Sequence, residues 1–355
     1  MTASMPQPEP RSDFALFART VKLAVDAHID AIAMERVTRA TRVSPDAGAV
    51  VTALFDLATR GGKRVRPVLL GAAHLACGGA KADPVAIAAG AAIEILHAYL
   101  LVHDDWMDDD DVRRGGPSVH TALRARFASR ADGDACAILA GDFGQAVAFE
   151  VLASLEAPPE RVLRVMTAVS HMLADVVMGQ IVDVRRVAAT REEVETMHRL
   201  KTSSYTTSGP LAIGATLAGA DEQMTAALRD AGDALGIAFQ LKDDLLGSFG
   251  DSARTGKSAR SDLRRGKRTA LVAELADDRE AQRLLPRVLG VEDAPDEEVD
   301  ALVDRMVRGG AKARVEARLA ALTAEARTRI ERLSLGAEGK SLLMGAIEAL
   351  SARRE

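Results

Sequence analysis

Residues 84–111 read PVAIAAGAAIEILHAYLLVHDDWMDDDD, the most apolar stretch of the chain followed at once by an acidic run. The apolar part extends from Pro84 to Val102, and Glu94 and His97 interrupt it. Those interruptions leave it short of the ~18 uninterrupted apolar residues expected of a membrane span. We therefore interpret the stretch as a buried helix, and we expect no transmembrane segment in the chain.

The acidic run places six aspartates within the eight positions 104–111. At about 100° per residue, Asp104 and Asp108 lie on one face of a helix, so their carboxylates can converge. Converging carboxylates raise one another's pKa values unless a cation lies between them, and Mg²⁺ suits oxygen ligands and phosphate-bearing substrates. The spacing predicts a magnesium site. The alternative is a solvated acidic turn, which the position at the end of a buried helix disfavours.

A second apolar helix ends in paired aspartates at Asp243 and Asp244. Two such helices face to face would build a metal cage. A basic run that includes Lys257 and Lys267 follows closely. Basic side chains near metal-binding carboxylates suit a polyphosphate, whose oxygens bridge the metals while lysine and arginine neutralise the remaining charge.

A third motif, GGKRVRP at residues 61–67, combines two glycines with Lys63 and Arg66. The glycines permit a tight turn and the two cations can point the same way, so the motif predicts an anion site. The glycine spacings of P-loops and of Rossmann dinucleotide-binding motifs are missing, which disfavours nucleotide binding.

The composition favours helices. Aromatic residues make up only 3% of the 355 residues, and prolines leave the runs 160–209, 211–285 and 296–355 free. Helical periodicity is frequent and no convincing strand pattern is found. We predict one all-α domain over residues 13–355, preceded by a disordered tail at residues 1–12.

Charge and cysteine content exclude several classes of protein. The formal net charge of −5 argues against a nucleic-acid binder, which should show a basic excess. Cys77 and Cys136 lack the spacing of a disulfide framework or a zinc site. This cysteine usage fits a reducing cytoplasm, and the N-terminus has no apolar core of a classical signal peptide.

Together these segments resemble the trans-isoprenyl diphosphate synthases, the polyprenyl synthetase family, over roughly residues 50–275. The family's motifs occur as GGKRVRP at 61–67, DDWMD at 104–108, Lys-Thr at 201–202 and Phe-Gln at 239–240. His97 and Gly179-Gln180 with Asp183 are further matches. One departure is Gly247, which occupies the last position of the second DDxxD motif. The resemblance implies a single large helical bundle of the isoprenoid synthase type around a deep central cavity.

The resemblance also implies the reaction: Mg²⁺-dependent head-to-tail condensation of isopentenyl diphosphate with dimethylallyl, geranyl or farnesyl diphosphate, carried out by a homodimer. Three Mg²⁺ ions are expected, which Mn²⁺ can replace. The family's metal ligands correspond to Asp104, Asp108 and Asp243, with Asp105 and Asp244 in support. We expect Gly247 to leave activity intact, with an open effect on metal affinity.

The resemblance assigns the substrate sites as well. The allylic diphosphate would bind Arg113, Lys201, Lys257 and Lys267. The isopentenyl diphosphate would bind Lys63, Arg66, His97 and Arg114. The allylic cation would be stabilised by the Lys201 carbonyl, the Thr202 hydroxyl and the Gln240 amide oxygen.

Product length is predicted from Tyr99 and Leu100, five and four positions before Asp104. On a helix these residues lie about 7.5 and 6 Å from it along the axis. In this family an aromatic residue at the fifth position forms a floor to the elongation pocket, so we expect geranylgeranyl diphosphate (C20). Farnesyl diphosphate (C15) or a longer chain is the alternative product, and Ile93 or Leu96 is the alternative floor.

Two other classes of protein remain as alternatives. A class I terpene cyclase would not need the anion site at residues 61–67. A non-catalytic synthase subunit would have lost aspartates or cationic residues that this chain retains.

Overall fold

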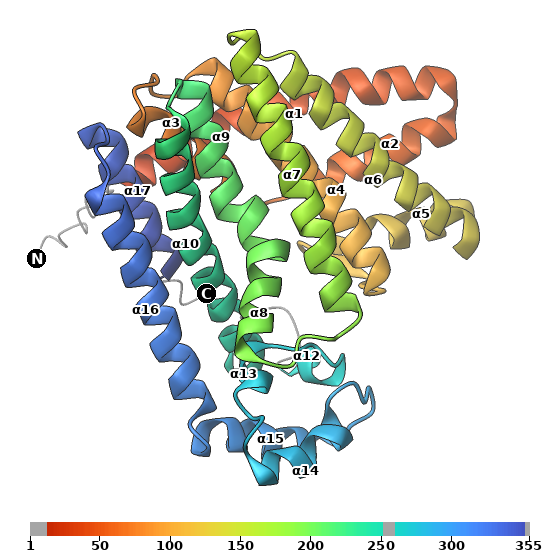
Figure 1. Ribbon diagram of the computed structural model, residues 1–355. Coiled ribbons are helices and arrows are strands. Elements are labelled where there is room, and N and C mark those ends of the chain that lie inside the picture. The colour runs from red at the N-terminus through yellow and green to blue at the C-terminus, as the bar shows by residue number, and fades with distance from the viewer. Residues whose placement is uncertain (1–12, 251–259, 352–355) are drawn as a thin grey trace, which may run out of the picture. The chain divides into compact units, whose positions relative to one another are not determined.

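The computed structural model describes residues 13–250 and 260–351 (Figure 1). The tail at residues 1–12 and Lys257, both named in the predictions, lie outside the described residues. The helices are α1 (Asp13–Val43), α2 (Pro45–Thr59), α3 (Val65–Ala76), α4 (Pro84–Met107), α5 (Val119–Phe127), α6 (Arg130–Ala153), α7 (Pro159–Val184), α8 (Arg191–His198), the π-helix η1 (Arg199–Ser208), α9 (Gly209–Ala218), α10 (Glu222–Phe249), α12 (Ser261–Arg264), α13 (Ala270–Ala273), α14 (Arg279–Val288), α15 (Asp296–Arg308), α16 (Ala311–Arg332) and α17 (Ala337–Ser351).

A short hairpin is the one β element in the described ranges 13–250 and 260–351. It consists of β1 (Val112–Arg113) and β2 (Gly116–Pro117), paired antiparallel with Arg113 opposite Gly116. Arg114 and Gly115 form the turn with φ of 52° and 73°, the positive values that a two-residue hairpin turn requires. Two-residue strands give no alternating pattern, which is why the sequence did not reveal them. The all-α prediction is confirmed.

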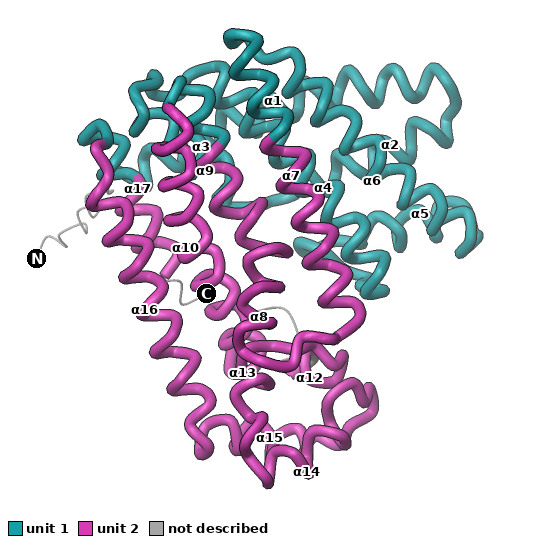
Figure 2. The backbone as a smooth tube through the Cα atoms, viewed as in Figure 1, with its two compact units in different colours: residues 1–167, 213–220, 335–342 teal, residues 168–212, 221–334, 343–355 magenta. Residues whose placement is uncertain are grey.

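The chain divides into two compact units (Figure 2). Unit 1 takes the described parts of residues 1–167, 213–220 and 335–342, and unit 2 takes those of 168–212, 221–334 and 343–355. The single domain over residues 13–355 and its central cavity stay predictions.

Unit 1 is built around α4. Asp83 caps this helix by accepting a hydrogen bond from the Val85 N–H at 3.1 Å, and Pro84 occupies the first turn. The helix packs against α1, α3 and α6 and buries Ile93, Ile95 and Leu96 to 1% exposure or less. Each such side chain stabilises the fold by roughly 1.5–3 kcal/mol. The burial confirms the interpretation of this stretch as a core helix and fixes the aspartates at its end.

Unit 2 is built around α10, which packs against η1 and α16. Two glycines let η1 approach closely, because a Cβ at Gly232 would lie 2.5 Å from the Ser208 Cα and one at Gly236 would lie 2.3 Å from the Ser203 Oγ. Hydroxyls of η1 use this proximity, and Thr207 donates to the Gly232 carbonyl at 2.8 Å. Long π-helices are rare and often occur at functional sites, so η1 directs attention to Lys201 and Thr202.

Three helices are long and apolar enough to cross a membrane, judged by length and composition alone: α4, α6 and α7. In their most apolar windows, 67%, 39% and 33% of the residues are buried in the structure. The last two helices therefore keep apolar surface exposed.

Candidate active site

Each unit carries part of the predicted site, and each part is described by itself. In unit 1, Asp104 lies in the last turn of α4 and Asp108 caps that helix, its N–H donating to the Asp104 carbonyl at 2.9 Å. Both aspartates are half-buried. One turn of helix separates them, so their carboxylates share a face as the spacing predicted.

Asp105 differs from its neighbours because its side chain is fully buried. It accepts a hydrogen bond from the Arg113 Nε at 2.6 Å, and the Arg113 Nη2 lies 3.7 Å from Asp104 and 3.4 Å from Asp110. Burial raises the pKa of Asp105 to about 6, although the Arg113 hydrogen bond opposes the rise. Arg113 therefore joins the hairpin to the carboxylates, and Asp105 is committed to a protein partner.

The anion site at residues 61–67 contains an arginine that the sequence analysis did not select. Arg64 is 2% exposed and adopts a left-handed conformation with φ of 50° at the start of α3. Its guanidinium donates to Asp26 at 2.7 Å, to Glu94 at 2.8 Å and to the Ala58 carbonyl at 2.8 Å. All these partners belong to the protein, so Arg64 holds the loop in place. The sequence feature that could have pointed to Arg64 is Glu94, a charged residue inside the most apolar helix that needs a cationic partner.

The predicted ligands of isopentenyl diphosphate gather next to this ion pair. The Arg66 Nη1 lies 4.0 Å from the Glu94 Oε1, and the Arg114 Nη1 donates to the Leu57 carbonyl at 3.1 Å. Burial keeps the pKa of His97 well below its ordinary value, and the positive charges of Arg66 and Arg114 lower it further. His97 is therefore neutral beside clustered cations. Lys63 is exposed at the edge of this loop.

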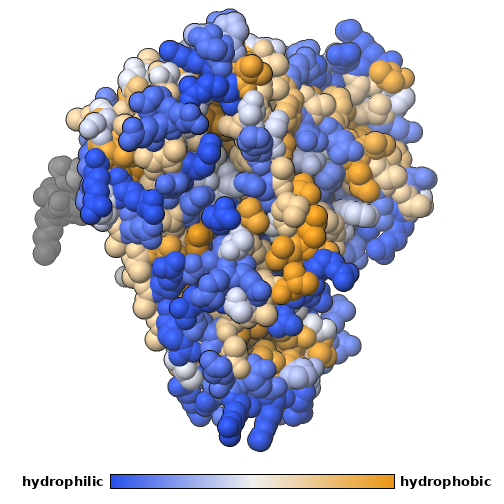
Figure 3. All heavy atoms as spheres, viewed as in Figure 1, coloured by the Kyte–Doolittle hydropathy of each residue, from blue (hydrophilic) through white to orange (hydrophobic). Residues whose placement is uncertain are grey.

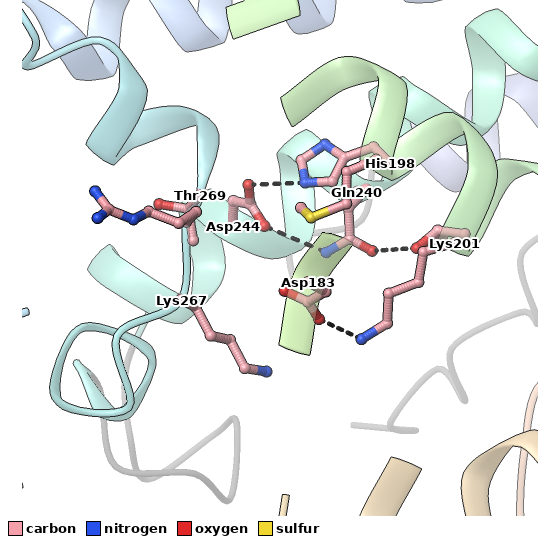
Figure 4. Close-up of a pocket in the computed structure, with 10 residues that line it drawn as sticks. Asp183, His198, Lys201, Gln240, Asp244, Lys267 and Thr269 are labelled. Carbon is pink, nitrogen blue, oxygen red and sulfur yellow. Dashed lines mark hydrogen bonds and ion pairs between the residues drawn. The ribbon is translucent and has the colours of Figure 1, made fainter. Parts of the chain in front are cut away.

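In unit 2, the predicted residues line a small cavity of about 80 Å³ (Figure 4). Lys201 forms an ion pair with Asp183, and the Thr202 hydroxyl donates to the Gln240 Oε1 at 3.1 Å. Gly179 explains the family's Gly-Gln pair, because a Cβ there would lie 2.4 Å from the Lys201 backbone nitrogen. The other lining residues are Met197, His198, Asp244, Lys267, Arg268 and Thr269. Met197, His198 and Thr269 were not predicted, whereas Arg268 belongs to the predicted basic run.

The two aspartates at the end of α10 have different surroundings. Asp243 is exposed, whereas Asp244 is 5% exposed. Asp244 accepts hydrogen bonds from the Gln240 amide at 3.2 Å and from the Ala270 N–H at 3.1 Å, and the His198 Nε2 lies 3.6 Å away. Burial raises the pKa of Asp244, against the opposing effect of His198.

Gly247, the departure from the family's second motif, lies beside another carboxylate. A Cβ added at Gly247 would lie 2.6 Å from the Asp262 Oδ2. Asp262 in turn lies 3.5 Å from the Lys267 Nζ. The space that a third aspartate of the motif would enter is therefore already bordered by an acidic side chain from α12.

Tyr99, the predicted floor, is 9% exposed on α4. Its ring meets the His103 ring edge to face at a centroid distance of 4.8 Å, and its Cβ lies 3.7 Å from the position of a Cβ on Gly144 of α6. Leu100 is half-buried. Tyr99 thus lies where α4 packs against α6, and its role as the floor stays a prediction.

The side chains available as metal ligands indicate how Mg²⁺ could bind. Among the residues that the structure describes, no three His, Cys, Asp or Glu side chains form a group that could hold a metal ion by themselves. Mg²⁺ is usually bound through one or two carboxylates together with waters and substrate phosphates. The half-buried pair Asp104 and Asp108 fits that mode of binding.

Comparisons with known proteins agree with these motifs. The sequence model of the polyprenyl synthetase family matches residues 49–306. The chain is 36% identical to the geranylgeranyl diphosphate synthase of Sulfolobus acidocaldarius over 74% of its own length and 78% of that protein. It is 36% identical to the (2E,6E)-farnesyl diphosphate synthase of Mycobacterium bovis over 71% of its length and 68% of that protein.

A solved structure is similar over nearly the whole chain. It is that of the geranylgeranyl pyrophosphate synthase of Corynebacterium glutamicum, complexed with isoprenyl diphosphate and magnesium, with a TM-score of 0.85 and 31% identity. The match covers 96% of this chain and 100% of that one. The chain belongs to the polyprenyl synthetase family. It is a prenyltransferase with the all-helical isoprenoid synthase fold, as predicted from its motifs.

Proposed function

We propose that this protein condenses isopentenyl diphosphate with allylic diphosphates to give geranylgeranyl diphosphate. The observation that carries the proposal is that carboxylates and a separate cationic cluster both stand at the ends of buried, packed helices. Relatives named geranylgeranyl diphosphate synthases support the C20 product. The retained aspartates and cations favour a catalytic synthase over a non-catalytic subunit, and the anion site at residues 61–67 disfavours a terpene cyclase.

The metal-binding residues in this proposal are Asp104, Asp108 and Asp243. When bound, Mg²⁺ neutralises the charge that develops on the departing diphosphate. Three ions, with Mn²⁺ as a substitute, remain part of the proposal. Asp105 and Asp244 support the site from buried positions and are not ligands themselves.

The allylic diphosphate binds Arg113, Lys201 and Lys267, joined by Lys257. Lys201 is held by Asp183, which keeps its ammonium group at the cavity. The Lys201 carbonyl, the Thr202 hydroxyl and the Gln240 amide oxygen stabilise the allylic cation, because they are electron-rich without being strong nucleophiles.

Isopentenyl diphosphate binds Lys63, Arg66, His97 and Arg114. The arginines around His97 outnumber the carboxylates, so a bound diphosphate relieves their mutual repulsion. Replacing Arg66 by Ala should raise KM for isopentenyl diphosphate about tenfold or more, since a charge-assisted hydrogen bond contributes about 1.5–3 kcal/mol. KM for the allylic substrate should change much less. Equal changes in both constants would mean that the two sites are misassigned.

The active form is a homodimer of cytoplasmic location. Apolar side chains gather over α7 on the face shown in Figure 3. Four of them are about half exposed: Val177 at 48%, Met178 at 56%, Ile181 at 51% and Val184 at 51%. Their spacing forms one stripe along the helix, a surface suited to a second copy of the chain. Light scattering should give the mass of a dimer, and Ile181→Glu should give a monomer.

The chain length of the product tests the proposed function. Purified protein with Mg²⁺, isopentenyl diphosphate and each allylic diphosphate in turn should yield mainly C20 chains after dephosphorylation and chromatography. A C15 product would place it with the farnesyl diphosphate synthases, as the Mycobacterium bovis relative suggests. Absence of condensation with every primer would contradict the proposed activity.

A further inference from the structure

Asp244 is enclosed by hydrogen-bond donors inside unit 2 (Figure 4). One carboxylate oxygen accepts from the Gln240 amide nitrogen at 3.2 Å, and the other accepts from the Ala270 N–H at 3.1 Å. The second oxygen also lies 3.6 Å from the His198 Nε2, whose ring is 3% exposed. Both oxygens are thus engaged by the protein, in a place that is 5% exposed to solvent.

These contacts determine which end of the Gln240 amide faces which way. Gln240 presents its NH₂ group to Asp244, whose Oδ1 accepts a hydrogen bond from it at 3.2 Å. The amide oxygen then points to the opposite side, where it accepts a hydrogen bond from the Thr202 hydroxyl at 3.1 Å. Thr202 thus donates to Gln240 and Gln240 donates to Asp244, which also accepts from Ala270, so both sides of the network end at the Asp244 carboxylate.

We propose that Asp244 is a positioning residue that fixes the orientation of the Gln240 amide, and that it is not a magnesium ligand. The inference rests on the proposed function, in which the Gln240 oxygen stabilises an allylic cation. A reversed amide would present its NH₂ dipole to the developing positive charge and would destabilise it. Neighbouring aspartates of one motif thus have separate tasks, since Asp243 is the metal ligand in the proposed function and is exposed, whereas Asp244 is buried.

The first variant is Asp244→Asn, which keeps the shape and removes one acceptor. The new side chain faces two N–H donors, one from Gln240 and one from Ala270. Its single oxygen can accept from one of them, and its NH₂ group then faces the other donor and cannot accept from it. Gln240 then loses its fixed orientation. We expect kcat to fall at least tenfold, as for the loss of other electrostatic groups, while half-saturation by Mg²⁺ stays within twofold.

A second variant provides a rescue. Asp244→Asn combined with Gln240→Glu exchanges the amide and the carboxylate, so that the asparagine NH₂ donates to the glutamate and its oxygen still accepts from Ala270. Thr202 can donate to the second glutamate oxygen. Because a carboxylate beside the allylic cation is itself a nucleophile, the rescue is measured by stability: the double variant should recover most of the melting temperature that Asp244→Asn loses. Gln240→Glu alone brings two carboxylates together and should stay impaired.

Asp278→Asn serves as a matched control. Asp278 also accepts backbone N–H groups, from Glu280 and Ala281 at 3.1 Å each, and it pairs with Arg305 at 2.6 Å, but it belongs to neither proposed substrate site. This change should leave kcat unaltered. If it lowered kcat as much as Asp244→Asn does, the effect of the latter would be general destabilisation.

A readout that does not need turnover separates positioning from metal binding. The rise in melting temperature caused by Mg²⁺ with inorganic pyrophosphate should persist in Asp244→Asn and should shrink in Asp243→Asn. Loss of that rise in Asp244→Asn, or no recovery in the exchanged pair, would overturn the inference. Failure of the wild-type protein to condense the substrates would instead contradict the proposed function.

Discussion

The aspartate pairs at the ends of α4 and α10 share a pattern and differ in their surroundings. In each pair the first aspartate is the more exposed and the second is buried. Consecutive residues on a helix point about 100° apart, so one carboxylate can face the core while its neighbour faces outward. Each DD pair thus presents its first carboxylate toward the surface and its second toward the core. The pairs differ in the buried partner, which is the charged Arg113 for Asp105 and neutral amides for Asp244.

The largest loss of activity is expected from the first aspartate of each pair, the position at which the two pairs are alike. Asp104→Ala or Asp243→Ala should each reduce the rate of condensation by at least ~10³-fold, by analogy with other key electrostatic groups in catalysis. Steady-state assays at saturating substrate and varied Mg²⁺ measure the loss. Near-normal turnover in either variant would show that the outward carboxylates do not bind the metal. The exposed Asp304 provides a control substitution to Ala, which should be neutral.

The helices also differ five positions before their aspartates, where α4 has Tyr99 and α10 has Ala238. If Tyr99 is the floor of the elongation pocket, Tyr99→Ala should give products at least one C5 unit longer, because Ala91 and Ala92 leave space further along α4. Chromatography of the dephosphorylated products measures the change. If a folded, active variant gave an unchanged product, Tyr99 would not be the floor of the elongation pocket, and Ile93 or Leu96 would be the alternative.

The third position of each motif provides a sharper contrast, with Asp108 on one helix and Gly247 on the other. Gly247→Asp restores the family pattern, but the new Cβ meets the Asp262 Oδ2 at 2.6 Å. Overpacking and charge repulsion should lower stability by about 1–2 kcal/mol, without stronger activation by Mg²⁺. Thermal unfolding and Mg²⁺ titration test this expectation. Adding Asp262→Asn should restore the part of the stability that is lost to charge repulsion, and tighter Mg²⁺ binding by the single variant would contradict the expectation.

An effect on stability that depends on pH concerns the buried Asp105, whose pKa is raised from 3.8 to about 6 by burial. The folded protein then binds more protons than the unfolded chain between these values, so the contribution of Asp105 to stability is full below 3.8 and is lost as pH rises through about 6. Relative to Asp105→Asn, the wild-type protein should lose stability over that range. Urea unfolding of both proteins without Mg²⁺, repeated across this pH range, measures the difference in stability.

The sequence predicted most of the fold and a set of candidate site residues, because helical periodicity, proline positions and the aspartate motifs are local signals. It could not show that Asp105 and Asp244 are buried, since the phase of a helix relative to its neighbours depends on packing. Arg64 and His198 were missed for a related reason. Their partners, Asp26 and Asp244, lie 38 and 46 positions away in the chain, and no spacing rule connects them.

The π-helix η1 has a consequence for insertions and deletions. Its backbone hydrogen bonds span five residues, so it accommodates one more residue per turn than the α-helices on either side. Deleting a single residue between Ser203 and Ser208 would let the segment return to ordinary α-helical pairing. Each residue of register corresponds to about 100° of rotation, so the Lys201-Thr202 pair would turn away from Gln240 while α8 and α9 kept their lengths. Relatives of this chain should therefore vary in length elsewhere and keep a constant residue count from Lys201 to Gly209.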